Sequence, residues 1–212
     1  MYVAMTAQIL PTQIVPAEKI TDGLTLPAGS EIVDIDSAEK KTIGSIFTET
    51  PYTLFILMRH YAWPPCHNHI QAVEESASDF QQLGCQVVVL ANGTREEGLV
   101  YRKQHPSKFP TYADPQWTVY RQLGLRRYLS ILTTTAMCGY GERKMRGLAF
   151  PELIFEGDDL WMMGGDFIVR NDGKVIFALH QKTYYERPTI EDMLSCLKDQ
   201  PAAGLAIQWT AN

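Results

Sequence analysis

The sequence lacks a long apolar segment, a surplus of basic residues and a cysteine-rich framework. No apolar run approaches the ~20 residues that a membrane-spanning helix needs. The formal net charge is −5, so no basic surplus is available to bind a phosphate backbone. With 45% hydrophobic and 20% charged residues, the chain has the composition of a soluble globular protein, and we expect neither a membrane nor a nucleic acid as partner.

Cysteine is scarce and widely spaced. The four cysteines are Cys66, Cys85, Cys138 and Cys196, a distribution typical of free thiols in a reducing compartment rather than of a disulfide-linked secreted domain. The start of the chain lacks the order of a signal peptide, because prolines and a glutamate interrupt its mildly apolar run. These features predict a cytoplasmic location.

The apolar pattern divides the chain into an arm, one domain and a tail. Residues 1–30 contain several prolines and no sustained period, so we expect an N-terminal arm with little regular structure. The domain, residues 31–200, is long enough to bury a core, and residues 201–212 form a C-terminal tail.

Strands and helices alternate in the first half of this domain. Residues 31–35 predict a short strand, and the apolar runs 51–58 and 86–91 predict strands buried on both faces. Between them, apolar residues at three- and four-residue steps predict an amphipathic helix that starts at Cys66 and ends at Gly84. This alternation indicates a parallel sheet.

Capping and turn residues mark the later elements. Thr94 and Glu97 have the spacing of a capping box, and Asp114 with Pro115 predicts the start of a helix that ends at Gly124. An Asn-Asp-Gly turn at 171–173 predicts a hairpin, and a last helix is predicted after Pro188 and Thr189. The fold class is therefore α/β, with a central mixed sheet flanked by helices.

One irregular stretch, residues 126–163, precedes the hairpin. Glycines and basic residues alternate there and are followed by bulky apolar side chains. A long insertion of this kind is typical of a lid or binding loop. Aromatic side chains that only cover the sheet would give the same pattern, so both interpretations stay open.

The residues between the strand 51–58 and the following helix read Arg-His-Tyr-Ala-Trp-Pro-Pro-Cys-His-Asn-His, from Arg59 to His69. Cys66 would lie at the first turn of the helix, where the helix dipole and unpaired N–H groups favour thiolate over thiol. Four residues are therefore candidates for a catalytic role: Cys66, Arg59, His60 and His67. Solvated helix-start residues are the plainer interpretation of His67 and His69.

The chain resembles the peroxiredoxin-like branch of the AhpC/TSA group in the thioredoxin superfamily. The resemblance covers residues 51–198 and depends on four pieces in order: LFILMRH leading into PPC, QVVVLA, FPTYADPQWTVYRQLGL and GGDFIVRNDGKVIFAL. It implies a thioredoxin-like fold, thiol redox chemistry on hydroperoxides or lipid endoperoxides, and thioredoxin or glutathione as reductant. A homodimer is compatible with it.

The motif departs from that family in two places. Trp63 replaces the first cysteine of the Cys-x-x-Cys pattern, and it also occupies the position where typical peroxiredoxins have threonine. The arginine that precedes the following strand in the usual pattern is absent from the stretch that begins at Gly164 and Gly165. A lone Cys66 needs another thiol, either external or from the chain, and Cys138 in the insertion is the candidate.

Two functions follow from these residues. The first is a thiol-dependent oxidoreductase acting through Cys66 on an organic peroxide or related lipophilic electrophile, with a substrate site formed by Trp63, Tyr61, His69, Gly164, Gly165 and Trp161. The second is a repurposed isomerase or cyclase of a biosynthetic pathway, with a pocket near Trp63, His60 and His67. A non-catalytic binding protein is a third interpretation. We expect no cofactor, and no metal, because no second ligand pair has zinc-like spacing.

Overall fold

The computed structural model describes residues 13–14, 23–61, 63–125, 127, 162–182 and 186–200. The strands are β1 (Gln13–Ile14), β2 (Glu31–Asp34), β3 (Lys40–Thr42), β4 (Tyr52–Leu57), β5 (Cys85–Ala91), β6 (Thr111–Ala113), β7 (Gly165–Arg170), β8 (Val175–His180) and β9 (Glu186–Arg187). The helices are α1 (Ile43–Phe47), α2 (Pro64–Glu75), α3 (Ala77–Gln82), α4 (Arg95–Gln104), α5 (Thr118–Gln122) and α7 (Ile190–Lys198).

Seven of these strands form one mixed sheet in the order β3-β2-β6-β5-β4-β7-β8. The strand β4 lies near its centre, parallel to β5 and antiparallel to β7. Phe55 at its middle pairs with Val88 on one side and Phe167 on the other. The predicted fold class, a mixed sheet of thioredoxin-like type flanked by helices, is confirmed.

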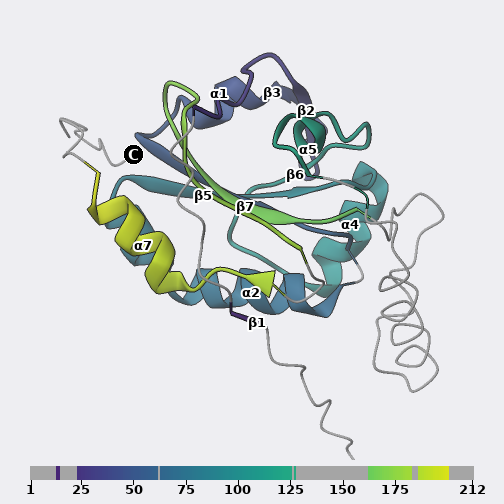
Figure 1. Ribbon diagram of the computed structural model, residues 1–212. Helices are drawn as coiled ribbons and strands as arrows, with labels where there is room; N and C mark the ends of the chain where they lie inside the picture. Colours follow the sequence, from purple (N-terminus) through teal and green to yellow (C-terminus); the bar gives the residue numbers. More distant parts are fainter. Residues whose placement is uncertain are drawn as a thin grey trace, which may run out of the picture.

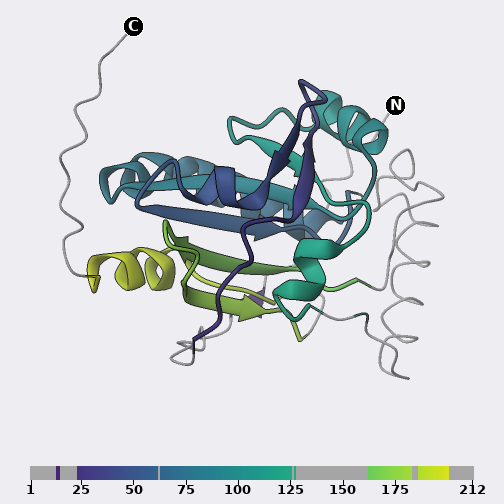
Figure 2. The ribbon, with the colours of Figure 1, turned by 90° about the horizontal axis from the view of Figure 1, so that it is seen from above.

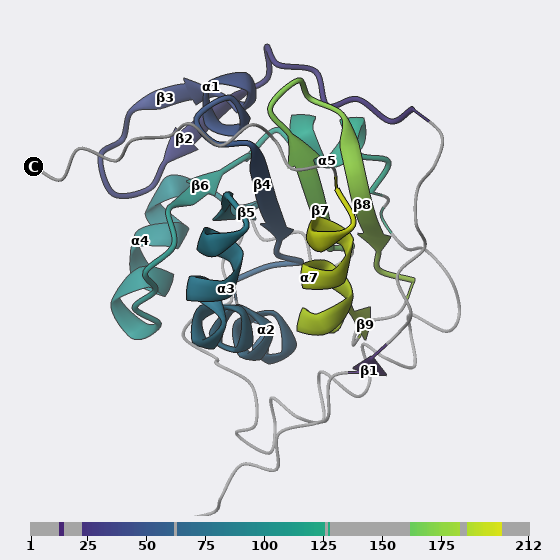
Figure 3. The same ribbon diagram turned by 90° about the vertical axis from the view of Figure 1, so that its left-hand side faces the viewer.

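Helices cover both faces of the sheet (Figure 1). Side chains of α2, α3, α4 and α7 pack on one face with Leu54 and Ile56 of β4, and Figure 3 shows α2, α3 and α7 in front of the strands. Side chains of α1 and α5 pack on the other face with Phe55 and Leu57. Figure 2 shows the ribbon from the side of this face. This alternation along β4 is the two-residue period of a strand with both faces buried.

The predicted caps and turn are present. The side chain of Thr94 accepts from the N–H of Glu97, and the Glu97 carboxylate accepts from the N–H of Thr94, which completes a capping box at α4. The side chain of Thr189 caps α7. In the β7–β8 turn, Gly173 has a φ of 86°, a conformation that favours glycine.

Two helix predictions were wrong in detail. The helix predicted from Cys66 to Gly84 is interrupted at Ser76, where φ −104° and ψ 13° separate α2 from α3. Serine has only a modest preference for helical backbone. The helix predicted from Asp114 begins only at Thr118, because Trp117 before it is left-handed with a φ of 56°.

The arm and the insertion are described only in part. In the arm, β1 pairs in parallel with β9, and Thr25 forms a bridge with Lys174. At the ends of the insertion, Arg127 forms a bridge with Met162, whereas residues 128–161 lie outside the described residues, as does the tail 201–212. The division into arm, domain and tail therefore stays a prediction. No helix in the described ranges has the length and apolarity required to span a membrane.

Candidate active site

Cys66 lies at the corner between β4 and α2, as its third helical residue. Trp63 is the extended residue before the helix, and Pro64 and Pro65 occupy the first two helical positions. Proline suits these positions because its fixed φ is already helical. The Cys66 side chain is fully buried, with 0% of its surface exposed.

The sulfur of Cys66 was predicted to lie among unpaired backbone N–H groups of the helix start, but its backbone donor comes from another segment. Pro64 and Pro65 have no N–H, and the N–H of Cys66 donates to the carbonyl of Trp63 at 3.0 Å. The sulfur instead accepts a hydrogen bond from the backbone N–H of Arg59, at 3.4 Å. The turn after β4 therefore supplies the backbone N–H that contacts the sulfur. The positive end of the α2 dipole adds to its effect on the thiolate.

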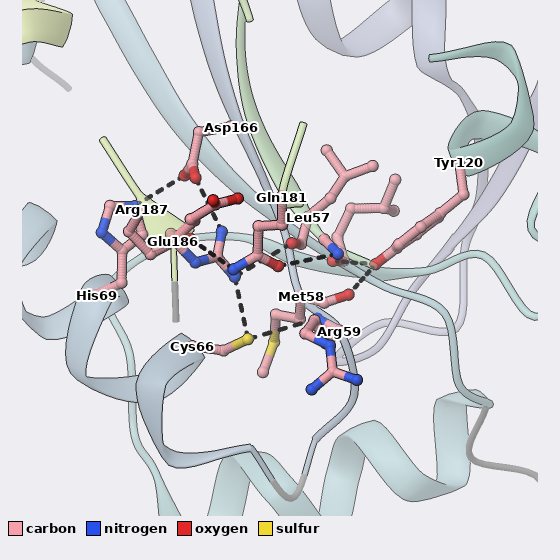
Figure 4. A network of polar contacts seen from close by, with 12 residues as sticks. Leu57, Met58, Arg59, Cys66, His69, Tyr120, Asp166, Gln181, Glu186 and Arg187 are labelled. Atoms are coloured by element: carbon pink, nitrogen blue, oxygen red, sulfur yellow. Dashed lines mark hydrogen bonds and ion pairs between the residues drawn. The ribbon is translucent and has the colours of Figure 1, made fainter. Parts of the chain in front are cut away.

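A guanidinium is the second donor to the sulfur (Figure 4). Arg187, on β9, places Nη2 3.0 Å from the Sγ atom of Cys66 and 3.4 Å from the carbonyl oxygen of Leu57. Its side chain is 0% exposed. A positive charge that donates to sulfur favours thiolate over thiol, and it does so strongly where water is excluded.

Arg187 is itself held by an acid and a histidine. Its Nη1 atom donates to Oδ2 of Asp166 at 2.9 Å, and Oδ1 of Asp166 accepts from Nε2 of His69 at 2.8 Å. Burial would raise the pKa of Asp166, but the charges and hydrogen bonds of His69 and Arg187 outweigh it and hold this pKa below its usual value. For Arg187, burial opposes ionisation, yet Asp166 and the sulfur raise its pKa.

The absence of a side chain at Gly164 makes room for this arrangement. A Cβ atom there would lie 2.4 Å from the carbonyl oxygen of Leu57, 2.7 Å from Oε1 of Gln181 and 3.3 Å from Nη2 of Arg187. The N–H of Gly164 donates to the Gln181 amide oxygen at 3.0 Å, and the Gln181 amide nitrogen donates to the Glu186 carbonyl at 2.6 Å. Gln181 thus connects the start of β7 to β9, the strand that carries Arg187.

The sequence comparisons assign the chain to a family. The model of the AhpC/TSA antioxidant enzymes matches residues 73–183, just over half of the chain. The chain belongs to this family. The matched segment begins after Cys66 and includes Gly164 and Asp166 but not Arg187.

Solved structures with the same fold include several peroxiredoxins. Peroxidoxin BcpB from Mycobacterium tuberculosis is 13% identical, with a TM-score of 0.57 over 82% of this chain and 96% of that one. A peroxiredoxin-like protein from Aquifex aeolicus is 13% identical, with a TM-score of 0.60 over 86% and 89%. The Xanthomonas campestris bacterioferritin comigratory protein is 11% identical, with a TM-score of 0.58 over 82% and 94%. No curated protein sequence matches the chain.

In this AhpC/TSA protein, the predicted residues before the helix are all buried. The guanidinium of Arg59 lies over the ring of Trp63, 5.0 Å from its centroid, and the rings of His60 and Trp63 are 5.7 Å apart. Tyr61 packs against Gly93 and Gly98, and its hydroxyl lies 3.4 Å from the Thr94 carbonyl. The hydrogen bond from Arg59 to the sulfur of Cys66 comes from the backbone N–H of Arg59.

His67 points toward α4. Its Nδ1 lies 3.4 Å from the hydroxyl of Tyr101, and its Nε2 lies 3.0 Å from Nδ1 of His105. Burial and the charge of His105 lower the pKa of His67 to about 4, although Glu74 opposes the shift. His67 therefore contacts Tyr101 and His105. These contacts are separate from the hydrogen bonds that connect Cys66, Arg187, Asp166 and His69.

The two other thiols in the described part of the chain, Cys85 and Cys196, lie far from this corner. Cys85 pairs with Tyr52 at the start of β4, whereas Cys66 follows the end of β4, roughly 16 Å away along the strand. Burial raises the pKa of the Cys85 thiol, and Cys196 is also buried. Cys138 and Trp161 lie outside the described residues.

Arg187, Asp166 and Gln181 were not among the predicted site residues. One signal was available, because the acidic Asp166 is the second residue of a largely apolar strand, and a buried carboxylate requires a partner. Nothing near Arg187 in the sequence indicates which partner that is. Within the described part of the chain, no group of three or more His, Cys, Asp or Glu side chains is arranged to hold a metal ion.

Proposed function

We propose that this AhpC/TSA protein is a thiol peroxidase whose peroxidatic cysteine is Cys66. The observation that carries the proposal is the 3.0 Å contact between the Cys66 sulfur and the Arg187 guanidinium. It provides a positive charge and a hydrogen-bond donor at the one atom that must be anionic to react. The peroxiredoxin fold of the structural neighbours supports the same conclusion.

The reaction balances with one peroxide and one proton. The thiolate of Cys66 attacks the terminal oxygen of a hydroperoxide, an S–O bond forms and the O–O bond breaks. The alkoxide that leaves takes a proton and departs as an alcohol, and Cys66 becomes a sulfenic acid. Arg187 is placed to stabilise both the attacking thiolate and the negative charge that develops on the leaving oxygen.

A buried donor of Arg187 supports this role. Its Nε atom is buried and has no hydrogen-bond partner among the described residues. Buried polar atoms of native proteins nearly always have a partner, so an unpaired donor beside a reactive thiol calls for a functional explanation. In the proposal, a peroxide oxygen supplies the acceptor when substrate is bound.

Apolar surroundings favour an organic hydroperoxide as substrate. Cys66 belongs to the apolar cluster that includes Met58, Trp63, Ile70 and Met163. Such neighbours accommodate an alkyl group better than they accommodate water or hydrogen peroxide. Because Cys66 has no exposed surface, substrate entry requires the corner to open.

An external thiol, thioredoxin or glutathione, is the proposed reductant. The sulfenic acid condenses with one thiol to a disulfide and water, and a second thiol then releases Cys66 in reduced form. Cys85 lies roughly 16 Å from Cys66 along β4, and Cys196 lies close enough to Cys85 to raise its pKa, so both are too distant to serve. A reducing compartment such as the cytoplasm would supply such donors.

Peroxide consumption tests the proposal. Wild-type protein should consume cumene hydroperoxide faster than hydrogen peroxide, and Cys66→Ser should abolish both activities. A dimedone adduct should form on Cys66 after stoichiometric peroxide, as measured by mass spectrometry. The matched control, Cys196→Ser, removes another buried thiol and should retain activity. Undiminished consumption by Cys66→Ser would refute the proposal, and a preference for hydrogen peroxide would refute the organic substrate class.

The isomerase or cyclase alternative is not favoured. Its support was the loss of a cysteine at Trp63 together with a pocket near His60 and His67. In the structure, His67 contacts Tyr101 and His105 instead, while the thiol has an arginine partner suited to redox chemistry.

A further inference from the structure

Four buried side chains form one continuous line of contacts from the thiol to a histidine (Figure 4). Cys66 contacts Arg187, Arg187 contacts Asp166, and Asp166 contacts His69. Cys66, Arg187 and Asp166 are 0% exposed, and His69 is 5% exposed. His69 lies three residues after Cys66 on α2, so both ends of the line project from the same face of one helix.

The charge of this group depends on two protons. Arg187 and Asp166 carry opposite charges that cancel. With a thiol at Cys66 and a neutral imidazole at His69, the net charge is zero. Ionisation of Cys66 alone would leave one uncompensated negative charge in a buried site, which is costly. A protonated His69 would restore neutrality.

We propose that His69 is a positioning residue that holds the compensating positive charge for the Cys66 thiolate and acts through Asp166 and Arg187. The proposal rests on the proposed function only in taking the thiolate as the reactive form. It deepens that function, because it gives the Cys66 thiolate a second positively charged group, His69, in addition to Arg187.

The hydrogen-bond chemistry fixes which atom of His69 changes. The Asp166 carboxylate is ionised and only accepts, so Nε2 of His69 carries a hydrogen in both protonation states. The variable proton is therefore on Nδ1. When it is present, the imidazolium strengthens its bond to Asp166, and Asp166 stays fixed against Arg187.

Other ionisable groups around the thiol do not replace this charge. Burial raises the pKa of both Tyr101 and Tyr120, so their hydroxyls stay neutral over the working range of pH. The positive charge of Arg59 lies over the ring of Trp63. Within the line itself, Arg187 and Asp166 are held in their charged forms by each other and by their neighbours.

Alkylation of Cys66 at a series of pH values tests the proposal without any peroxide. His69→Gln retains a side-chain N–H for Asp166 but cannot become charged. The midpoint of the pH profile, followed on the Cys66 peptide by mass spectrometry, should rise by about one pH unit, and alkylation at neutral pH should slow about tenfold. The plateau at high pH reports access to the thiol and should change little.

The control is His105→Gln, which alters a half-buried histidine outside this line and should leave the midpoint unchanged. If His69→Gln shares the wild-type midpoint while His69→Leu shifts it, His69 acts through its hydrogen bond alone and the proposal is overturned. An unshifted midpoint in both variants also overturns it.

A second measurement avoids any substitution at His69. Coupling between two protons is mutual, so removing the thiolate must weaken the hold of His69 on its proton. In Cys66→Ser, NMR titration of the His69 ring should therefore show deprotonation at a lower pH than in wild type. An unchanged titration would overturn the proposal even if Cys66 proved to be peroxidatic, whereas the peroxide assay of Cys66→Ser tests the function alone.

Discussion

Replacing Arg187 separates the contribution of the buried ion pair to stability from its contribution to chemistry. Arg187→Met retains most of the length of the side chain but removes the guanidinium from both Cys66 and Asp166. The carboxylate of Asp166, which is 0% exposed, would then keep His69 as its one side-chain partner in the described part of the chain. Both stability and reactivity should fall, for different reasons.

The stability loss follows from the burial of this pair. Removing one partner of a buried ion pair costs about 3–5 kcal/mol, because the other charge remains desolvated. A domain of this size unfolds with about 5–15 kcal/mol, and each kcal/mol corresponds to about 2–4 °C in Tm. The Tm of Arg187→Met should therefore fall by roughly 6–20 °C.

A double variant distinguishes the two effects. Asp166→Asn removes the orphaned charge and still offers an oxygen to the N–H of His69. Replacement of both charged partners is often close to neutral for stability, so the double variant with Arg187→Met should recover most of the lost unfolding free energy. Its peroxide reduction should stay at least about a hundredfold below wild type, because the donor to the sulfur is still missing.

Urea unfolding followed by circular dichroism measures the first quantity, and single-turnover oxidation of Cys66 measures the second. The reasoning is refuted if the double variant is as unstable as Arg187→Met, since the cost would then not arise from an unpaired charge. It is refuted equally if Arg187→Met oxidises at the wild-type rate.

Three further predictions concern the surroundings of the site. Gly164→Ala should lower both Tm and the rate of peroxide reduction, because its Cβ would lie 2.4 Å from a carbonyl oxygen of β4. The control is Gly29→Ala, whose Cβ would meet nothing within 4 Å and which should match wild type in both assays. Tyr120→Phe should cost about 1–3 kcal/mol in urea unfolding, because the buried hydroxyl lies 2.6 Å from the carbonyl that follows β4; an unchanged midpoint would contradict this. Burial and His105 lower the pKa of His67 from 6.5 to about 4, so the unfolded state gains its proton first as pH falls. Unfolding free energy should therefore decrease from pH 6.5 to about pH 4, and His67→Gln should weaken that dependence.

Much of the fold could be predicted because its signals are local. The strands β4 and β5 are continuous apolar runs, the capping box of α4 spans four residues, and the hairpin turn is marked by Gly173. Each signal depends on backbone geometry and burial within a short segment. Helix boundaries were less accurate, since the break at Ser76 and the left-handed Trp117 are not marked by glycine or proline.

The sequence by itself determined that Cys66 lies where a buried central strand turns into a helix. It could not determine what touches the sulfur. Arg187 is 121 residues away along the chain and belongs to a two-residue strand, and its place beside Cys66 depends on the space left by Gly164 and on Asp166. Only the tertiary structure decided this, because contacts between distant segments are set by how the sheet and helices pack and not by any local pattern.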